Sequence, residues 1–383
     1  MNRWLGTYSV TKQGPFAGFD IEIRSQRSMR ETYPVAGLAC QYQASTYPPD
    51  VVDRLAESSL PLLKEWLAKN PQGNCTLETA SKRKEWSDLT PTQRQEYTSA
   101  VLCLMDKPAL TSKQAPGAKS RFDDYVTVHI QQTPRNHGSY WNWDRYASDP
   151  AASPLFDGSP SSMSGNGHPL PHGGIPIPGA PPPNDMIPPG DGGGCVTMGP
   201  FANMTVNLGP LAPSLNLNEI KPNPQSDGLG YNPRCLRRDI NRHAAAVTTA
   251  NYTYDLITRN KNVYWFQTVM EGEFDKGKWG VHTGGHYTVG GDPAGDFFVS
   301  PGDPQFWLHH AMIDRVWWIW QMQDLRKRLE EVSMTRTMMN FPPSANGTLD
   351  DVSNLGVLAG DVKIRELMST LGGMGGRLCY IYE

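Results

Sequence analysis

The stretch Asp303-Pro-Gln-Phe-Trp-Leu-His-His-Ala-Met-Ile-Asp314 carries the most information about the fold. It opens a long apolar pattern, typical of a buried helix, that predicts a helix from Phe306 to Val332. His310 lies near the start of this helix, with Asp314 one turn later and Trp317 a further turn along the same stripe. Carboxylates often orient metal-binding histidines, so we expect Asp314 to orient His310.

Other histidines point to the same chemistry. The chain has nine, and one group of four is His282, His286, His309 and His310. His282 and His286 are four residues apart, which places both imidazoles on one face of a helix. A second pair, His129 and His137, lies on and just after a predicted helix over 121–132. Any single histidine is most simply a packed or hydrogen-bonded residue, but the cluster together with 303–314 favours a metal site. Neutral imidazoles suit Cu, Zn or Ni rather than Mg or Ca.

Composition limits the remaining possibilities. The 383 residues are enough for one large domain or two ordinary ones, and a net charge of -3 gives no indication of nucleic-acid binding or of an anionic membrane surface. No apolar run approaches the roughly 20 residues of a membrane span. Further helices are expected over 49–70, 92–105 and 236–259, and a strand over 378–382. The Pro/Gly-rich segment 149–232 is either an ordered functional loop or partly disordered.

The 303–314 stretch resembles the second-copper signature of tyrosinases, catechol oxidases and hemocyanins, Asp-Pro-x-Phe-x3-His-x3-Asp. The matching residues are Asp303, Pro304, Phe306, His310 and Asp314. The resemblance implies that His310 is a copper ligand and that His309 is a packing or hydrogen-bonding neighbour. It also implies that His282 and His286 are the other two ligands of the second copper.

Similarity to the short secreted polyphenol oxidases of ascomycete fungi extends from about Pro49 to the C-terminus. It divides the chain into an irregular segment 1–48 and a tyrosinase copper-binding domain 49–383, and it implies that His129 and His137 bind the first copper. The family's Trp-His-Arg helix, which supplies the third ligand, is missing between Ser139 and Tyr140. We therefore expect poor folding or an incomplete first copper site, since the possible replacements are weak: His168, His172 and His243.

The resemblance also implies the fold and the reaction. The fold expected is mainly α, a helix bundle around a dinuclear copper centre with long Pro/Gly-rich loops and a few short strands. The reaction expected is oxidation of o-diphenols to o-quinones by dioxygen, with o-aminophenols and monophenols as further substrates to consider. Thr283 and Tyr287, which follow two ligands, are expected to hold phenols, and Thr283 in place of Asn favours o-diphenol or o-aminophenol oxidation. Glu271 resembles the family acid that orients a water. Small phenols and dioxygen are the expected partners, without nucleic acid or membrane.

Three alternatives remain. A non-catalytic or single-copper protein would keep the second site and lack oxidase activity. A zinc hydrolase would need a general base beside His282, and position 283 is Thr. An extracellular interaction module would leave the histidine cluster unexplained.

Cysteines and glycosylation sequons bear on the compartment. Six cysteines form no CxxC pair, and sequons begin at Asn74, Asn203, Asn251 and Asn346. Residues 1–26 lack the features of a signal peptide, whereas the resemblance implies secretion. The family has a cysteine in the missing segment, so one of the cysteines after Cys40 is expected to lack a partner, and Cys195–Cys235 is the bridge we expect to survive.

Overall fold

The computed structural model describes residues 45, 47–131, 139–337 and 340–383. The predicted irregular segment 1–48 therefore lies almost wholly outside the described residues, as do Cys40 and the predicted ligand His137. Residues Ser45–Glu383 form one compact unit. No helix in the described ranges is long and apolar enough to cross a membrane.

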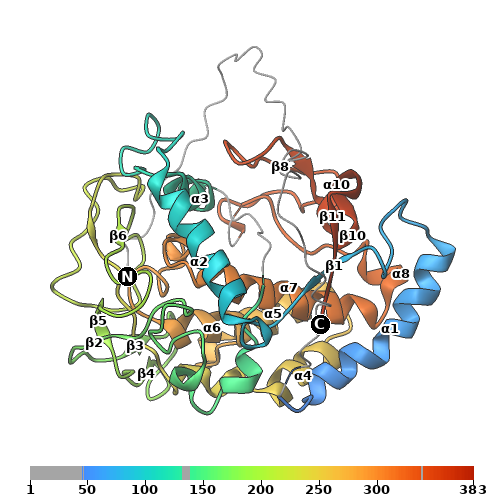
Figure 1. The fold of residues 1–383 in the computed structure, drawn as a ribbon, viewed down its shortest axis with the longest axis horizontal. Coiled ribbons are helices and arrows are strands. Elements are labelled where there is room, and N and C mark those ends of the chain that lie inside the picture. Colours follow the sequence, from blue (N-terminus) through green and yellow to red (C-terminus); the bar gives the residue numbers. More distant parts are fainter. Residues whose placement is uncertain (1–44, 46, 132–138, 338–339) are drawn as a thin grey trace, which may run out of the picture. The chain divides into compact units, whose positions relative to one another are not determined.

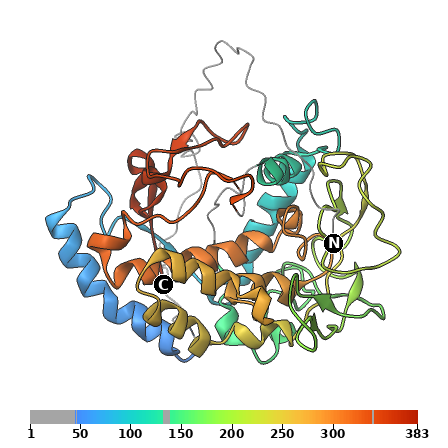
Figure 2. The same cartoon turned by 180° about the vertical axis from the view of Figure 1, so that it is seen from behind.

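Helices dominate this unit, as the sequence predicted (Figure 1). Helix α7 lies at its centre, packs against α1, α4 and α6, and buries most of its side chains (Figure 2). The helices are α1 (Val51–Lys69), α2 (Pro91–Asp106), α3 (Arg121–Gln131), α4 (Ala250–Arg259), α5 (Val263–Glu271), α6 (Val281–Val289), α7 (Phe306–Met322), α8 (Leu325–Arg328), α9 (Ile364–Leu367) and α10 (Gly373–Gly376). Two short 3₁₀ turns also matter for the site, η2 (Trp143–Tyr146) and η4 (Ala244–Val247).

Local signals start the helices where the sequence predicted them. Asp50 caps α1 and Thr90 caps α2, each through a capping box in which side chain and backbone satisfy one another. Two predicted spans were wrong. Residues 236–243 are not helical because their backbone pairs with other segments, as in the bond from the amide of Gly193 to the carbonyl of Arg238 at 2.8 Å. The long predicted helix over 306–332 ends at Met322 and resumes only as α8.

The Pro/Gly-rich segment 149–232 is ordered. It contains short antiparallel pairs and a small second core built around Ile175 and Ile187. A disulfide joins Cys195 to Cys235, as predicted. The paired strands are β2 (Gly167–Pro169) with β5 (Gly193–Val196), β3 (Ile175–Pro176) with β4 (Met186–Ile187), and β6 (Thr205–Val206) with β7 (Arg234–Cys235).

Arg238 joins this segment to the start of α7. Its guanidinium donates to both carboxylate oxygens of Asp303 at 2.7 and 2.8 Å, and both side chains are fully buried. The same guanidinium donates to the carbonyls of Met163 and Ser164 in the loop. The signature residue Asp303 thus fixes the position at which α7 begins, because a buried ion pair holds its geometry only when its remaining donors are also satisfied.

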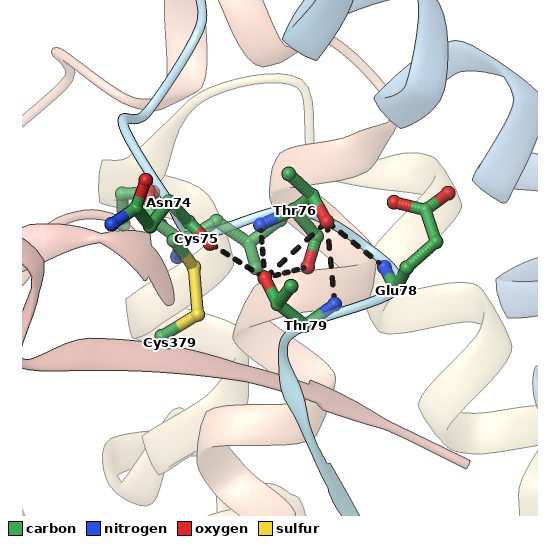
Figure 3. Close-up of a disulfide and its surroundings, with 8 residues drawn as sticks. Asn74, Cys75, Thr76, Glu78, Thr79 and Cys379 are labelled. Atoms are coloured by element: carbon green, nitrogen blue, oxygen red, sulfur yellow. Dashed lines mark hydrogen bonds between the residues drawn. A yellow bond between two sulfur atoms is a disulfide. The ribbon is translucent and has the colours of Figure 1, made fainter.

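The C-terminal strand completes a small sheet. β11 (Leu378–Tyr382), a strand the sequence predicted, pairs with β1 (Ser81–Arg83) and β10 (Leu371–Gly372). A disulfide joins Cys75 to Cys379, next to a loop closed by hydrogen bonds between Thr76 and Thr79 (Figure 3). Cys103 is exposed and has no disulfide partner among the described cysteines. β8 (Val352–Ser353) and β9 (Val362–Lys363) form a separate pair.

Asp314 belongs to this end of the molecule. Its carboxylate accepts hydrogen bonds from the hydroxyls of Tyr380 and Tyr382 on β11 and lies 3.6 Å from the guanidinium of Arg83. The prediction that Asp314 orients His310 was therefore wrong. This side chain ties α7 to the C-terminal strand.

Candidate metal centre

Helices α6 and α7 bring three of the predicted ligands together. His282 and His286 lie one turn apart on α6, and His310 lies near the start of α7. Their Nε2 atoms form a triangle: His282 to His286 is 3.2 Å, His286 to His310 is 3.1 Å, and His282 to His310 is 3.4 Å. We call these residues the histidine trio.

The outer ring nitrogens show which atom of each ring carries the proton. Nδ1 of His282 donates to both carboxylate oxygens of Glu271 at 2.7 and 2.8 Å, and Nδ1 of His286 donates to the carbonyl of Ala294 at 3.2 Å. Carboxylates and carbonyls only accept, so in the neutral rings the proton is on Nδ1 and Nε2 keeps its lone pair. Two lone pairs therefore face one another inside the trio, an arrangement that calls for a cation.

The spacing fits a metal ion. Imidazole nitrogens bind such ions at about 2 Å, and three nitrogens sharing one ion at that distance lie a little over 3 Å apart. The trio has this separation without further movement. An all-imidazole donor set suits copper, zinc or nickel, so the residues present fit the copper that the resemblance implied.

Burial keeps these rings neutral. It lowers the pKa of His286, His309 and His310 well below the usual value, and the neighbouring imidazoles lower it further. Burial acts in the same direction on His282, but the Glu271 carboxylate outweighs it and raises the pKa of that ring. Metal ligands must be deprotonated at Nε2, and most of the cluster is ready for this at neutral pH.

His309 supports the trio from behind. Its Nε2 donates to the backbone carbonyl of His282 at 3.1 Å, and its ring stacks on that of His282. Gly285 makes room for it: a Cβ at this position would lie 2.1 Å from Cε1 of His309. Sequence reasoning did not single out Gly285, although its place inside His282-x3-His286 was a usable signal. Phe306 stacks on His310 with ring centroids 3.9 Å apart.

The predicted first-copper ligands are placed differently. His129 on α3 is buried, and its Nδ1 donates to the carbonyl of Phe298 at 2.9 Å, which leaves its Nε2 lone pair free. Burial lowers the pKa of His129 to about 4. In the described ranges His129 does not join the group of four clustered histidines, and His137 lies outside them.

The weak replacement candidates also lie outside that group. His172 is buried, with its Nε2 3.3 Å from a carboxylate oxygen of Asp239 and its Nδ1 accepting from the amide of Gly174. His168 and His243 are exposed. These contacts explain His172 as part of the loop structure.

The three predicted catalytic residues have distinct surroundings. Glu271, the last residue of α5, bonds directly to His282 rather than only facing solvent. The Thr283 hydroxyl donates to the backbone carbonyl of Glu271 at 2.8 Å and so braces α6 against the end of α5. Tyr287 packs against the second core around Ile175, and burial raises its pKa.

Residues 139–146 hold a second polar group that sequence reasoning missed. Buried polar atoms on these residues have no hydrogen-bond partner in the described part of the chain: the indole N–H groups of Trp141 and Trp143, the amide nitrogen of Asn142, Oδ2 of Asp144 and Nε of Arg145. Two guanidinium nitrogens of Arg315 on α7 are likewise without a partner there. Burial raises the pKa of Asp144 to about 8, although a hydrogen bond from Thr253 opposes the shift. Native proteins leave few such atoms unpaired. Further unpaired buried atoms lie elsewhere in the described residues, on Trp86, Gln305 and His309 among others.

Comparisons with known proteins agree with this geometry. The model for the common central domain of tyrosinase matches residues 129–323. The tyrosinase-like protein orsC of Emericella nidulans is 36% identical over 342 residues, which cover 79% of this chain and 89% of that protein. Tyrosinase P of Aspergillus terreus is 33% identical over 335 residues, covering 78% and 91%. The structure of a mutant polyphenol oxidase from Thermothelomyces thermophila superimposes with a TM-score of 0.78 at 38% identity, covering 88% of this chain and 99% of the other.

Proposed function

The chain belongs to the tyrosinase family and is an oxidoreductase, and from this premise we propose that it uses copper to oxidise o-diphenols to o-quinones with dioxygen. One observation carries the proposal. The Nε2 atoms of the histidine trio converge within 3.1 to 3.4 Å while Nδ1 of His282 and of His286 is bonded away from the centre. Hydrogen bonding alone does not explain this convergence, and a shared copper ion does.

The residues then have separate tasks. His282, His286 and His310 would hold one copper, and His129 with His137 would contribute to the other. Glu271 fixes the ring of His282, and the carbonyl of Ala294 fixes that of His286. Phe306 and Gly285 keep the rings packed together. Bound copper would supply the electron exchange between phenol and dioxygen. Two o-diphenols give up four electrons and four protons in total, which reduce one dioxygen to two waters.

The substrate proposal rests on Thr283. Its hydroxyl already donates to the carbonyl of Glu271 at 2.8 Å, so it presents no free amide to a bound phenol as an asparagine would. We therefore propose o-diphenols and o-aminophenols as substrates in preference to monophenols. Oxygen uptake with 4-tert-butylcatechol, 2-aminophenol and tyrosine tests this order, and rapid uptake with tyrosine would contradict it.

A non-catalytic or single-copper protein remains a second candidate, because the family's Trp-His-Arg helix, which supplies the third ligand of the first copper, is missing between Ser139 and Tyr140. The copper-to-protein ratio, measured by elemental analysis after reconstitution, separates the two. Two coppers per chain together with catechol oxidation support the oxidase. One copper per chain without oxygen uptake supports the single-copper form of the second candidate. A chain that binds no copper contradicts the oxidase and the single-copper protein and leaves the non-catalytic one.

We also propose that the protein is secreted. It has two disulfides, Cys75–Cys379 and Cys195–Cys235, and such bonds persist in oxidising compartments. The asparagines of all four sequons are exposed. Detection of the protein in the culture medium, with glycans released by an N-glycosidase, tests this proposal.

A further inference from the structure

A pocket has Glu271 in its lining, and none of the four clustered histidines lines it. Its volume is about 600 Å³, within the usual range for small-molecule sites. One stripe of α5 forms its inner wall, because residues spaced three and four apart share a helix face: Tyr264, Gln267, Thr268 and Glu271. The opposite face of α5, with Val263 and Phe266, is buried in the core, which holds the wall rigid.

An arm of the chain forms the outer wall. Residues 332–335 and 346–347 line the pocket, and backbone bonds hold the two strands of the arm together. The amide of Gly347 donates to the carbonyl of Met334 at 2.9 Å, and Thr335 pairs with Asn346. The side chain of Met334 lies against Gly347, where a Cβ would come within 2.4 Å of it.

The charge and the apolar groups of the pocket lining indicate which class of ligand would bind. Among the described residues of the lining, Glu271 alone carries a formal charge at neutral pH, and 42% of its side chain is exposed. Tyr264 offers an aromatic face that is 55% exposed, and Met334 offers a thioether that is 40% exposed. A carboxylate beside an aromatic ring and a thioether favours a cation that carries an aromatic group. The same carboxylate disfavours anions.

We propose that this pocket binds arylalkylamines, with the ammonium group at Glu271 and the aromatic ring between Tyr264 and Met334. The ligand would not be the reacting phenol, because the pocket meets the Nδ1 side of His282 through Glu271, whereas the trio converges on Nε2. The amine would therefore not be oxidised at the metal centre, and its binding goes beyond the proposed oxidase activity.

The position of Glu271 also couples the pocket to the metal centre, and this part rests on the proposed role of His282 as a copper ligand. Both oxygens of Glu271 contact His282 Nδ1 at 2.7 and 2.8 Å. An ammonium ion drawn to the same carboxylate weakens its hold on the ring and so makes His282 a poorer ligand. Amine and copper should therefore weaken one another by the same factor.

The first experiment measures binding alone. Metal-free protein produced without glycans is titrated calorimetrically with 2-phenylethylamine, 2-phenylethanol and phenylacetate, none of which carries a phenol that copper could oxidise. We expect the amine to bind with a Kd of about 1 mM, and the anion at least about tenfold more weakly. Tyr264→Ala should weaken amine binding about fivefold. Tyr254→Ala on α4 is the control, since Tyr254 is a tyrosine that is 37% exposed and lies outside the lining. Equal binding of amine and anion, or no effect of Tyr264→Ala, would overturn the proposal.

The second experiment measures the coupling. Copper affinity is determined by competition with a chelator, with and without saturating 2-phenylethylamine, and a loss of about fivefold is expected. Glu271→Gln should remove this dependence. Amine binding with unchanged copper affinity would overturn the proposed coupling, while the proposal that the pocket binds amines would stand. Failure of the protein to bind copper at all would count against the proposed function only.

Asn346, which lines the pocket, begins a sequon. Amine binding that vanishes when this residue carries a glycan would instead show that the pocket seats the glycan in the secreted protein.

Discussion

The histidine trio and residues 139–146 both pack against the first turns of α7, yet their polar atoms are paired very differently. In the trio, Nδ1 of His282 and of His286 has an acceptor, and the lone pairs turned inward are explained by a cation. In residues 139–146, which pack on α7 through the amide of Trp141 and the ring of Trp143, several buried atoms have no partner among the described residues. In the first region the supporting His309 keeps one unpaired atom, Nδ1, whereas the second region keeps several.

The difference indicates which of the two expected copper sites keeps its supporting residues in this sequence. The trio comes from two helices whose internal spacing sets the geometry, so it survives as a unit. Several of the unpaired atoms lie just after Ser139, where the family helix is expected to be missing from the sequence. Removal of a packed helix would leave such atoms, because its polar groups and theirs would have been partners. Other unpaired atoms, on Trp86 and Gln305 for example, lie elsewhere, so the weakness of the first copper site stays a prediction.

The largest expected effect is the loss of copper binding when one residue of the histidine trio is replaced. His286→Ala removes the ligand whose Nε2 lies nearest to that of His310, at 3.1 Å. Copper affinity should fall by more than about 100-fold, because two imidazoles cannot replace three. Metal analysis after dialysis measures this loss. His168→Ala, an exposed loop histidine, is the control and should retain its copper. Equal copper content in both variants would show that the metal binds elsewhere.

Much of this region could be predicted from the sequence. The spacing of His282 and His286 and the 303–314 stretch predicted ligands on two facing helices, and both helices are present. What could not be predicted depends on contacts between distant segments. Residues 236–243 have a helical pattern, but their backbone is paired with the Pro/Gly-rich loop and with α6. Asp314 lies one helical turn after His310, but its carboxylate accepts hydrogen bonds from Tyr380 and Tyr382 of β11 instead.

The next prediction concerns packing beneath the trio. Gly285→Ala places a methyl group 2.1 Å from the ring of His309, so that ring and the trio stacked on it must move. Overpacking of this kind destabilises a core by about 1 to 3 kcal/mol. We expect a lower midpoint of chemical denaturation and weaker copper binding. Gly360→Ala has open space at its Cβ and should change neither. A Gly285→Ala protein with unchanged copper affinity would show that His309 does not support the trio.

A smaller effect tests the link between Glu271 and His282. Glu271→Gln keeps a hydrogen-bond acceptor near Nδ1 but removes the charge. Loss of such a partner to a metal ligand lowers affinity by about 10-fold or somewhat more. Chelator competition measures the change, and the optical spectrum of the copper protein reports whether the ligand set is intact. Gln267→Glu, on the same face of α5, returns a charge to the pocket without that contact. The double variant should therefore not recover copper affinity, and recovery would show that charge alone is required.

The smallest effect lies in the second region and depends on pH. Burial raises the pKa of Asp144 to about 8, so this carboxyl is protonated in the folded protein below that pH and ionised in the unfolded chain above about 4. The folded state binds more protons in this window, so the contribution of Asp144 to stability falls as pH rises from about 4 to 8. Asp144→Asn keeps an oxygen that can accept from Thr253 and removes the titration. The variant should match the parent near pH 5 and become more stable than it at pH 7, by about 1 kcal/mol or less per pH unit.

Urea denaturation at both pH values measures the difference, with Asp157→Asn, an exposed loop aspartate, as the control. A variant that is equally destabilised at both pH values would show that the carboxyl of Asp144 is ionised and paired in the folded protein. Asp144 would then not belong with the unpaired atoms after Ser139.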